Sequence, residues 1–113
     1  PPSVDMARAA AAAAGLGDRV TFTLAEGESL SEHDVFDAAF LFECLHDMPR
    51  PVQVLTAVRE GVRPGGPVVV MDEAVADDFH APADDVDRIM YGYSMFVCLP
   101  DGMSSTPSTG TGR

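Results

Sequence analysis

Three side chains that can exchange protons or accept hydrogen bonds stand close together in one short polar segment. They are Glu43, His46 and Asp47, and the segment ends at Pro49. A neutral imidazole can accept a proton near neutral pH, and an adjacent carboxylate can orient it or raise its pKa. This combination makes the segment the first candidate for a chemical site.

The polar segment directly follows an apolar run, Phe36–Phe42, which only Asp37 interrupts. An apolar run bounded by polar residues is typical of a strand that is buried on both faces of a sheet. In open α/β sheets, ligands bind just beyond the carboxyl ends of such strands. We therefore predict a strand over Phe36–Phe42 and a ligand site over residues 42–48.

The composition limits the class of protein and its partners. The chain has 113 residues, of which 46% are hydrophobic, which suits one folded domain and excludes a disordered chain. A net charge of −11 repels phosphate, so nucleic acids and anionic membranes are not expected partners. Cys44 and Cys98 show no pairing pattern, and neither a signal peptide nor an apolar run of ~20 residues is visible. We expect free thiols and a cytoplasmic location.

The first part of the chain predicts a helix and a strand. Val4–Ala14 contains no helix breaker, Ser3 suits the N-cap, and Gly15 can end the helix in a left-handed conformation. We expect this alanine-rich helix to pack closely on a sheet through its small side chains. Val20–Leu24 alternates apolar and polar residues, which predicts a strand. A polar connection follows, and His33 within it is interpreted as a solvated loop residue.

The middle of the chain predicts a helix and a second apolar strand. Pro51 fits the first turn of a helix, and four apolar residues follow at about helical spacing. They are Val52, Leu55, Val58 and Val62. Arg63–Gly66 supplies a proline and glycine turn that ends this helix. Pro67–Met71 is then a fully apolar strand that closes on Asp72 and Glu73.

The last part of the chain predicts one more helix and a tail. Residues 76–85 are acidic and loop-like, and a helix is expected from about Asp84 to Val97, ended by residues 99–102. Its apolar stripe consists of Val86, Ile89, Met90, Tyr93, Phe96 and Val97. The alternation of helices and strands predicts an α/β fold with parallel strands and right-handed crossover helices. We expect one domain over residues 1–100 and a flexible tail over residues 101–113.

A larger pattern emerges when these elements are taken in order. A strand that begins with Phe36–Asp37 is followed by Cys-Leu-His-Asp-Met, then a helix, then Arg-Pro-Gly-Gly and an apolar strand ending in Asp-Glu. This order resembles the second half of the nucleotide-binding core of class I S-adenosylmethionine-dependent methyltransferases. Tyr91–Ser94 and Cys98–Pro100 resemble a bacterial small-molecule branch of that superfamily. The resemblance covers nearly the whole chain and implies a partial, Rossmann-like methyltransferase domain over residues 1–100.

The sequence departs from that family's pattern toward both ends. The family's first strand with its glycine-rich turn, its second strand and the last two strands of its sheet have no counterpart among the 113 residues. The resemblance therefore implies a fragment of a longer enzyme that lacks the first two and last two strands. Unpaired strand edges are costly when buried. We expect the isolated chain to be inactive, and either to be unstable or to pair its remaining strands directly.

The resemblance also implies a site for S-adenosylmethionine. Glu26 and the backbone N–H of Gly27 match the positions that bind adenine in the family. Phe42 and Glu43 end the strand where cofactor and substrate meet. The electron-rich face of the Phe42 ring would favour a sulfonium cation. The alternative for Glu26 is a solvated loop carboxylate, and the alternative for Phe42 is a core aromatic.

The same resemblance leaves His46 with two interpretations. In plant small-molecule O-methyltransferases a His-Asp pair at the matching place carries the catalytic base, so His46 would take the proton of an acceptor hydroxyl. In other members the histidine only caps the strand, and the aspartate caps the next helix. Tyr91 and Met95 lie where the family contacts its substrate, although residues of an apolar stripe are more often part of a core.

Three functions are consistent with these residues. The first is methyl transfer from S-adenosylmethionine to a small molecule, in a full-length enzyme that could be a homodimer. The second is a non-catalytic remnant that serves as a packing or dimerisation piece. A dinucleotide oxidoreductase is disfavoured because the Leu-His-Asp and Pro-Gly-Gly placement does not suit it. No metal is expected, because His80 and the acidic residues around it match no zinc spacing.

Overall fold

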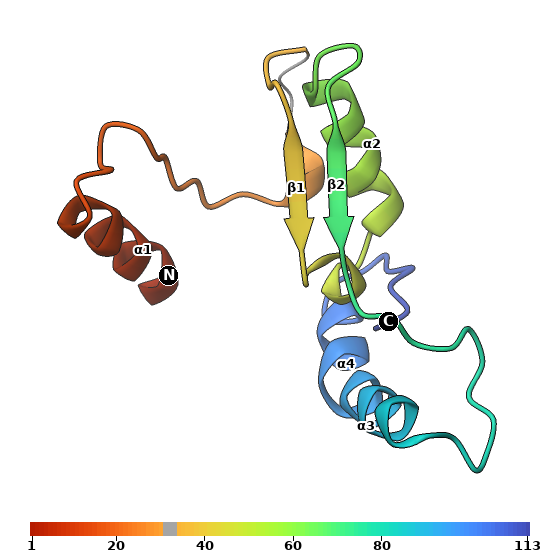
Figure 1. Ribbon diagram of the computed structural model, residues 1–113. Coiled ribbons are helices and arrows are strands. Elements are labelled where there is room, and N and C mark those ends of the chain that lie inside the picture. The colour runs from red at the N-terminus through yellow and green to blue at the C-terminus, as the bar shows by residue number, and fades with distance from the viewer. Residues whose placement is uncertain (31–33) are drawn as a thin grey trace.

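The computed structural model describes residues 1–30 and 34–113, and its centre is a two-stranded parallel sheet (Figure 1). The elements in chain order are α1 Pro2–Ala13, the 3₁₀ turn η1 Gly27–Ser29, β1 Ala39–Phe42, the 3₁₀ turn η2 Leu45–Asp47, α2 Pro51–Gly61, β2 Val68–Met71, α3 Asp85–Tyr93, the π-helical segment η3 Ser94–Cys98 and α4 Leu99–Gly102. His33, interpreted above as a loop residue, lies outside the described residues.

The helices of the described residues are all too short or too polar to cross a membrane.

The β1–α2–β2 unit holds most of the core. β1 and β2 run parallel, with Ala39 opposite Val68 and Phe42 opposite Met71. This arrangement confirms the prediction of parallel strands joined by a helix, and with it a partial α/β fold. The buried apolar side chains of this unit are Leu41, Val54, Ala57 and Val62.

β1 is buried on one face of the sheet, not on both. Leu41 is buried, whereas Phe40 and Phe42 are 62% and 54% exposed. Side chains alternate between the two faces of a strand, so both phenylalanines lie on the face opposite Leu41, beside Val69 and Met71. The prediction of burial on both faces is wrong because no element of the described chain covers this second face.

The turn between α2 and β2 explains why β1 starts later than Phe36. Phe36 pairs with Val62 only in an isolated parallel bridge. Gly66 then approaches so closely that a Cβ would lie 2.6 Å from the Asp37 carbonyl oxygen and 2.5 Å from Val62 Cγ1. Only glycine fits there, and regular pairing begins at Ala39.

α2 begins where the sequence predicts, and its predicted apolar stripe is only partly buried. Val62 is buried and Leu55 and Val58 are half-buried, whereas Val52 is 68% exposed. Val54 and Ala57, which are not members of that stripe, are buried. In the structure η1 also packs on α2, so closely that a Cβ on Gly27 would lie 3.1 Å from Val54 Cγ2.

α1 forms as predicted but lies apart from the sheet. It has no buried residue, and Figure 1 shows it well separated from both strands. Ser3 is not its N-cap, because the helix already begins at Pro2. Gly15 ends it in the left-handed region, with φ of +69°. The predicted packing on a sheet is wrong for this structure, since α1 satisfies its own backbone hydrogen bonds and needs no support from a sheet to form.

No strand forms over Val20–Leu24, so this prediction is also wrong. The segment is irregular, and its Phe22 carbonyl oxygen accepts a hydrogen bond from Arg8 Nη2 at 2.9 Å. A strand forms only by pairing with a neighbour. In the described chain β1 and β2 pair with each other, and neither pairs with this segment.

The last helix starts as predicted but continues further. The Asp84 side chain accepts a hydrogen bond from the Asp87 N–H at 2.9 Å and caps α3. α3 then runs through η3 into α4, so Leu99 and Pro100 do not end it. Pro100 lies in the first turn of α4, where its missing N–H costs little.

The apolar stripe predicted for this helix is not buried. Its exposed members are Val86, Ile89, Tyr93, Phe96 and Val97. Cys98 is buried instead, because it faces Asp47 of η2. The helix therefore buries the side that meets the sheet edge, and nothing in the described residues covers its apolar stripe.

Residues 103–113 form an irregular segment that returns toward the end of the sheet. The Thr109 N–H donates to the Pro49 carbonyl oxygen at 2.8 Å. The Arg113 guanidinium donates to the Asp77 carbonyl oxygen and to the Tyr91 hydroxyl. The flexibility expected of residues 101–113 stays a prediction.

Candidate functional site

The candidate site begins where β1 ends. The Glu43 N–H donates to the Met71 carbonyl oxygen at 2.8 Å, which extends the pairing by one residue. Glu43 then adopts a φ of +48°, an unusual conformation for a residue other than glycine. This turn directs the chain into η2, which carries His46 and Asp47. Backbone strain of this kind clusters at functional sites.

Asp72, the first residue after β2, fixes η2 in place. Its Oδ2 accepts hydrogen bonds from the backbone N–H groups of Leu45 at 3.1 Å and His46 at 3.3 Å. Its Oδ1 bonds to His46 Nδ1 and accepts from the Glu73 N–H at 3.0 Å. One carboxylate thus joins the carboxyl ends of both strands, and it sets the position of the histidine ring.

The His46 ring is held between two carboxylates. Its side chain is 7% exposed, with Nδ1 on Asp72 and Nε2 at 3.3 Å from Asp47 Oδ1. Burial lowers the pKa of His46, but the hydrogen bond and charge of Asp72, with the charges of Asp47 and Glu73, outweigh burial and raise it. For Asp72, burial raises the pKa, and the bond to His46 more than reverses this, so its pKa is lowered.

Two thiols lie near this ring. Burial, followed by the carboxylate of Asp47, raises the pKa of the Cys98 thiol to about 11. Burial also raises the pKa of Cys44, with a contribution from the charge of Asp72. Both groups are therefore protonated at neutral pH, and neither is an activated nucleophile. Both cysteines are free, as expected from the sequence.

The predicted adenine loop is attached to the same end of the sheet. Glu28, in η1, forms an ion pair with Arg50, which immediately precedes α2. The backbone N–H of Glu28 and then the Arg50 guanidinium lower the pKa of Glu28. Glu26 and Gly27, which precede Glu28, are exposed. The ion pair thus anchors this loop to Arg50, which follows Asp47 by three residues in the sequence.

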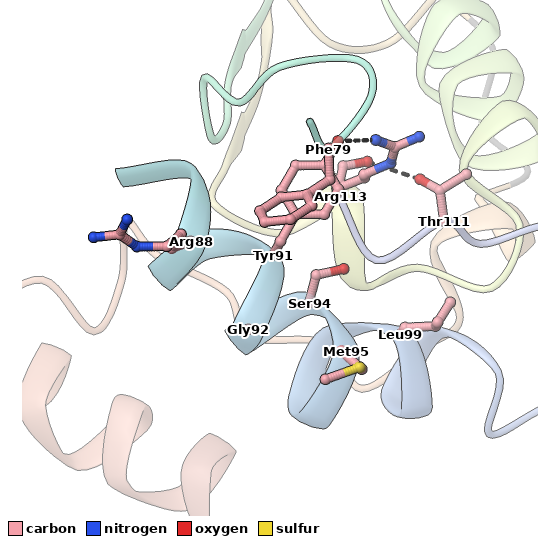
Figure 2. Close-up of a pocket in the computed structure, with 9 residues that line it drawn as sticks. All are labelled: Phe79, Arg88, Tyr91, Gly92, Ser94, Met95, Leu99, Thr111 and Arg113. Carbon is pink, nitrogen blue, oxygen red and sulfur yellow. Dashed lines mark hydrogen bonds between the residues drawn. The ribbon is translucent and has the colours of Figure 1, made fainter. Parts of the chain in front are cut away.

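Two cavities lie beside these residues. The smaller, about 250 Å³, is lined by Leu45, His46, Pro51, Asp72, Glu73, Thr111 and Arg113. The larger, about 580 Å³, is lined by Phe79, Arg88, Tyr91, Gly92, Ser94, Met95, Leu99, Thr111 and Arg113 (Figure 2). Thr111 and Arg113 belong to both walls, so the two cavities adjoin.

The larger cavity contains both residues predicted to contact substrate. Tyr91 and Met95 lie on its wall, and the rings of Tyr91 and Phe79 are 5.2 Å apart between centroids (Figure 2). The Arg113 guanidinium lies 5.3 Å from the centre of the Tyr91 ring. The wall is therefore mostly apolar and aromatic, with a cationic group at one side.

The predicted cofactor residues are only partly brought together. Phe42 and Glu43 are adjacent and exposed at the end of β1, and the Phe42 ring lies 5.8 Å from that of Phe40. No described contact joins them to Glu26 or Gly27. Their roles stay predictions, with the adenine loop anchored nearby through Glu28.

Sequence reasoning did not assign a role to Asp72, Thr111 or Arg113. A signal for Asp72 was present, because the ends of two adjacent parallel strands must meet at one edge of the sheet. No comparable signal exists for Thr111 and Arg113, since their contacts depend on the path of an irregular segment.

Comparison with known families agrees with this arrangement. Residues 1–70 match the family described as Methyltransferase domain, and this match covers more than half of the chain. The chain belongs to the methyltransferase domain family. The matched region includes β1, η2 and α2, and with them His46 and the predicted adenine loop. Asp72, Tyr91 and Met95 lie beyond it.

Proposed function

We propose that this chain takes part in S-adenosylmethionine-dependent methyl transfer to a small-molecule acceptor, on a Rossmann-like sheet. Membership of the methyltransferase domain family supports the reaction class. The observation that carries the proposal is the pair of adjoining cavities, one lined by His46 and Asp72 and the other by Tyr91 and Met95. An apolar cavity with a few convergent polar groups is what a small organic acceptor requires.

The residues present suit parts of the cofactor. When bound, S-adenosylmethionine supplies a methyl group carried on a positively charged sulfur. The exposed carboxylate of Glu26 can accept a hydrogen bond from an adenine amino group, and Gly27 beside it presents backbone without a side chain. The exposed Phe42 ring and the Glu43 carboxylate suit a cation. These four residues would hold the cofactor on the strand side of the site.

The main contribution of this chain's own residues is positioning. Methyl transfer is an in-line displacement, which depends on the alignment of acceptor and methyl group. Asp72 holds η2 and the His46 ring through three contacts. Tyr91 and Met95 form the apolar wall against which an acceptor can pack.

The role of His46 as a catalytic base stays a prediction, and it requires that an acceptor hydroxyl reach Nε2 of the ring. Because Nδ1 is engaged by Asp72, only Nε2 could take a proton. The raised pKa of His46 strengthens it as a base but enlarges the protonated fraction at any given pH. An acceptor hydroxyl would also have to reach Nε2 in the space that Asp47 now occupies.

A second candidate is a non-catalytic packing or dimerisation piece. The exposed apolar face of the sheet, formed by Phe40, Phe42, Val69 and Met71, favours it. An uncovered face of this kind is typical of a surface that associates with another chain. Under this proposal the family core would serve assembly and not catalysis.

A binding and turnover experiment separates the two candidates. Calorimetry would measure S-adenosylmethionine binding, and transfer of a labelled methyl group would be followed over phenols, amines and carboxylic acids. In a full-length enzyme that contains this chain, we expect His46→Ala to reduce turnover by about 100-fold or more, and His80→Ala, in an exposed loop, to leave it unchanged. Absence of cofactor binding, together with a dimer in analytical ultracentrifugation, would favour the second candidate.

A further inference from the structure

Three potential metal ligands from two distant segments meet beside η2. His46 and Asp47 belong to η2, and Cys98 comes from the end of η3. One ligand atom from each residue lies within 4.8 Å of the other two. This cluster could not be predicted from the sequence, because Cys98 stands about fifty residues after the other two and no common zinc motif has such a spacing.

The histidine is oriented as a metal ligand would be. Its Nδ1 bonds to Asp72, which leaves the lone pair of a neutral ring on Nε2. Histidines that bind metals commonly give their other ring N–H to a carboxylate, which fixes the tautomer and raises the basicity of the ligand. Asp72 takes that place here, and it is itself held by three backbone N–H groups.

The aspartate supplies an independent observation. Asp47 Oδ1 is buried and has no hydrogen-bond partner in the described chain. It lies 3.3 Å from His46 Nε2, without the geometry of a hydrogen bond. A buried carboxylate oxygen that has no hydrogen-bond partner in the described chain is free to accept a bond from a water or to bind an ion. The distance favours an ion, because two ligands about 2.0–2.2 Å from a tetrahedral zinc are about 3.4 Å apart.

The surroundings favour a divalent cation. The carboxylates of Asp47 and Asp72 both lie against the His46 ring, and Glu73 lines the same cavity as His46. The negative potential of these three carboxylates would stabilise a cation bound between the ligands. Thiolate and imidazole ligands select zinc over magnesium or calcium, which prefer oxygen.

We propose that His46 Nε2, Asp47 Oδ1 and Cys98 Sγ form a three-ligand zinc site at the carboxyl end of the sheet. Binding forms zinc–sulfur and zinc–nitrogen bonds, and the thiol proton and any proton on Nε2 are released to solvent. The Cys98 sulfur must lie about 3.6 Å from the other two ligand atoms in a tetrahedral site. It therefore has to approach them by at most about 1.2 Å from the present limit of 4.8 Å. His46 lies on the wall of the smaller cavity, from which a water or substrate molecule can reach the fourth position on the zinc.

The zinc proposal does not require that the chain take part in methyl transfer. A zinc ion on Nε2 uses the lone pair that a general base needs, so it replaces the base role predicted for His46. It also differs from the expectation, drawn from sequence spacing, that no metal binds. Three protein ligands and one open position are the pattern of catalytic zinc sites, whereas structural sites use four protein ligands.

The test uses the full chain after treatment with a chelator. Zinc would be titrated by calorimetry, and Co²⁺ would be used as a spectroscopic substitute whose thiolate charge-transfer band reports a sulfur ligand. We expect one ion per chain. Cys98→Ser should abolish the band and weaken zinc binding by more than about 100-fold, and Asp72→Asn should weaken zinc binding by about 10- to 100-fold.

The second cysteine provides the matched control. Cys44→Ser should keep both the cobalt band and zinc affinity, because Cys44 is not part of the cluster. A measurement on the unmodified chain covers the case in which Cys98→Ser fails to fold: zinc should slow alkylation of Cys98, located by mass spectrometry, and leave Cys44 unaffected. The proposal is overturned if no stoichiometric zinc binds, if the band survives in Cys98→Ser, or if zinc protects only Cys44.

Discussion

The region before η1, residues 2–26, and the β1–α2–β2 unit differ in the interactions that hold them in place. Residues 2–26 contain a regular helix but no buried side chain. The β1–α2–β2 unit contains shorter strands but four of the five buried apolar residues of the described chain. Local regularity and burial are therefore separated within one short protein.

The difference follows from where backbone hydrogen bonds are made. A helix bonds each N–H to a carbonyl four residues earlier, so α1 forms from local propensity alone. A strand depends on a partner, and residues 20–24 remain irregular without one. The structure of residues 2–26 therefore reflects local propensity alone. The structure of the β1–α2–β2 unit depends in addition on packing between elements.

The largest expected effect is on stability and compares a buried leucine with an exposed one. Leu41→Ala removes a buried side chain from the centre of the unit and should lower the free energy of unfolding by about 2–5 kcal/mol. Leu24→Ala, at a side chain that is 69% exposed, should change it by less than about 0.5 kcal/mol. Urea unfolding followed by circular dichroism measures both. Equal effects would show that residues 20–24 pack in solution in a way that the structure lacks.

A smaller effect is expected from a pair of glycine substitutions. Gly66→Ala places a methyl group 2.6 Å from the Asp37 carbonyl oxygen and should destabilise the unit by about 1–3 kcal/mol. Gly17→Ala meets its nearest neighbour, Ala12 Cα, at 3.9 Å and should be neutral or slightly stabilising. The same unfolding experiment applies, and a neutral Gly66→Ala would mean that the turn after α2 is not closely packed.

The smallest expected effect concerns pH and the anchor of the adenine loop. Because the pKa of Glu28 is lowered from 4.5, its ion pair with Arg50 stabilises the fold above pH 4.5. That stability is lost as the pH falls through the lowered pKa. Arg50→Gln should move the pKa of Glu28 back toward 4.5, which an NMR titration of its side-chain carboxyl measures.

A matched glutamate controls this titration. Glu28→Gln should remove part of the acid dependence of unfolding, whereas Glu60→Gln, on the exposed side of α2, should leave it intact. If Glu28 titrates at 4.5 in both the parent chain and Arg50→Gln, the loop is not anchored by this pair.

Much of the β1–α2–β2 unit could be predicted from the sequence. The apolar runs, Pro51 and the Arg-Pro-Gly-Gly turn placed two strands and a helix within a few residues of their observed bounds. The faces that they bury could not be predicted. Val54 is buried, and Val52 is not, because η1 packs on α2 from a distant part of the chain.

The candidate site shows the same division. The segment with Glu43, His46 and Asp47 was located correctly at the carboxyl end of a strand. Tyr91 and Met95 were expected near a substrate, and they line the larger cavity. The partners of His46 were not predicted, because Asp72 and Cys98 reach it only through the fold.

The sequence by itself therefore determined α1, the order of strand, helix and strand, and the position of the polar segment after β1. Each of these depends on contacts within a few residues, such as helical hydrogen bonds, glycine turns and apolar runs. Only the tertiary structure decided that residues 20–24 remain unpaired, that β1 is covered on one face, and that His46 lies between Asp72, Asp47 and Cys98. Those outcomes depend on side chains and backbone groups that are far apart in the sequence, and local propensity carries no information about their distances.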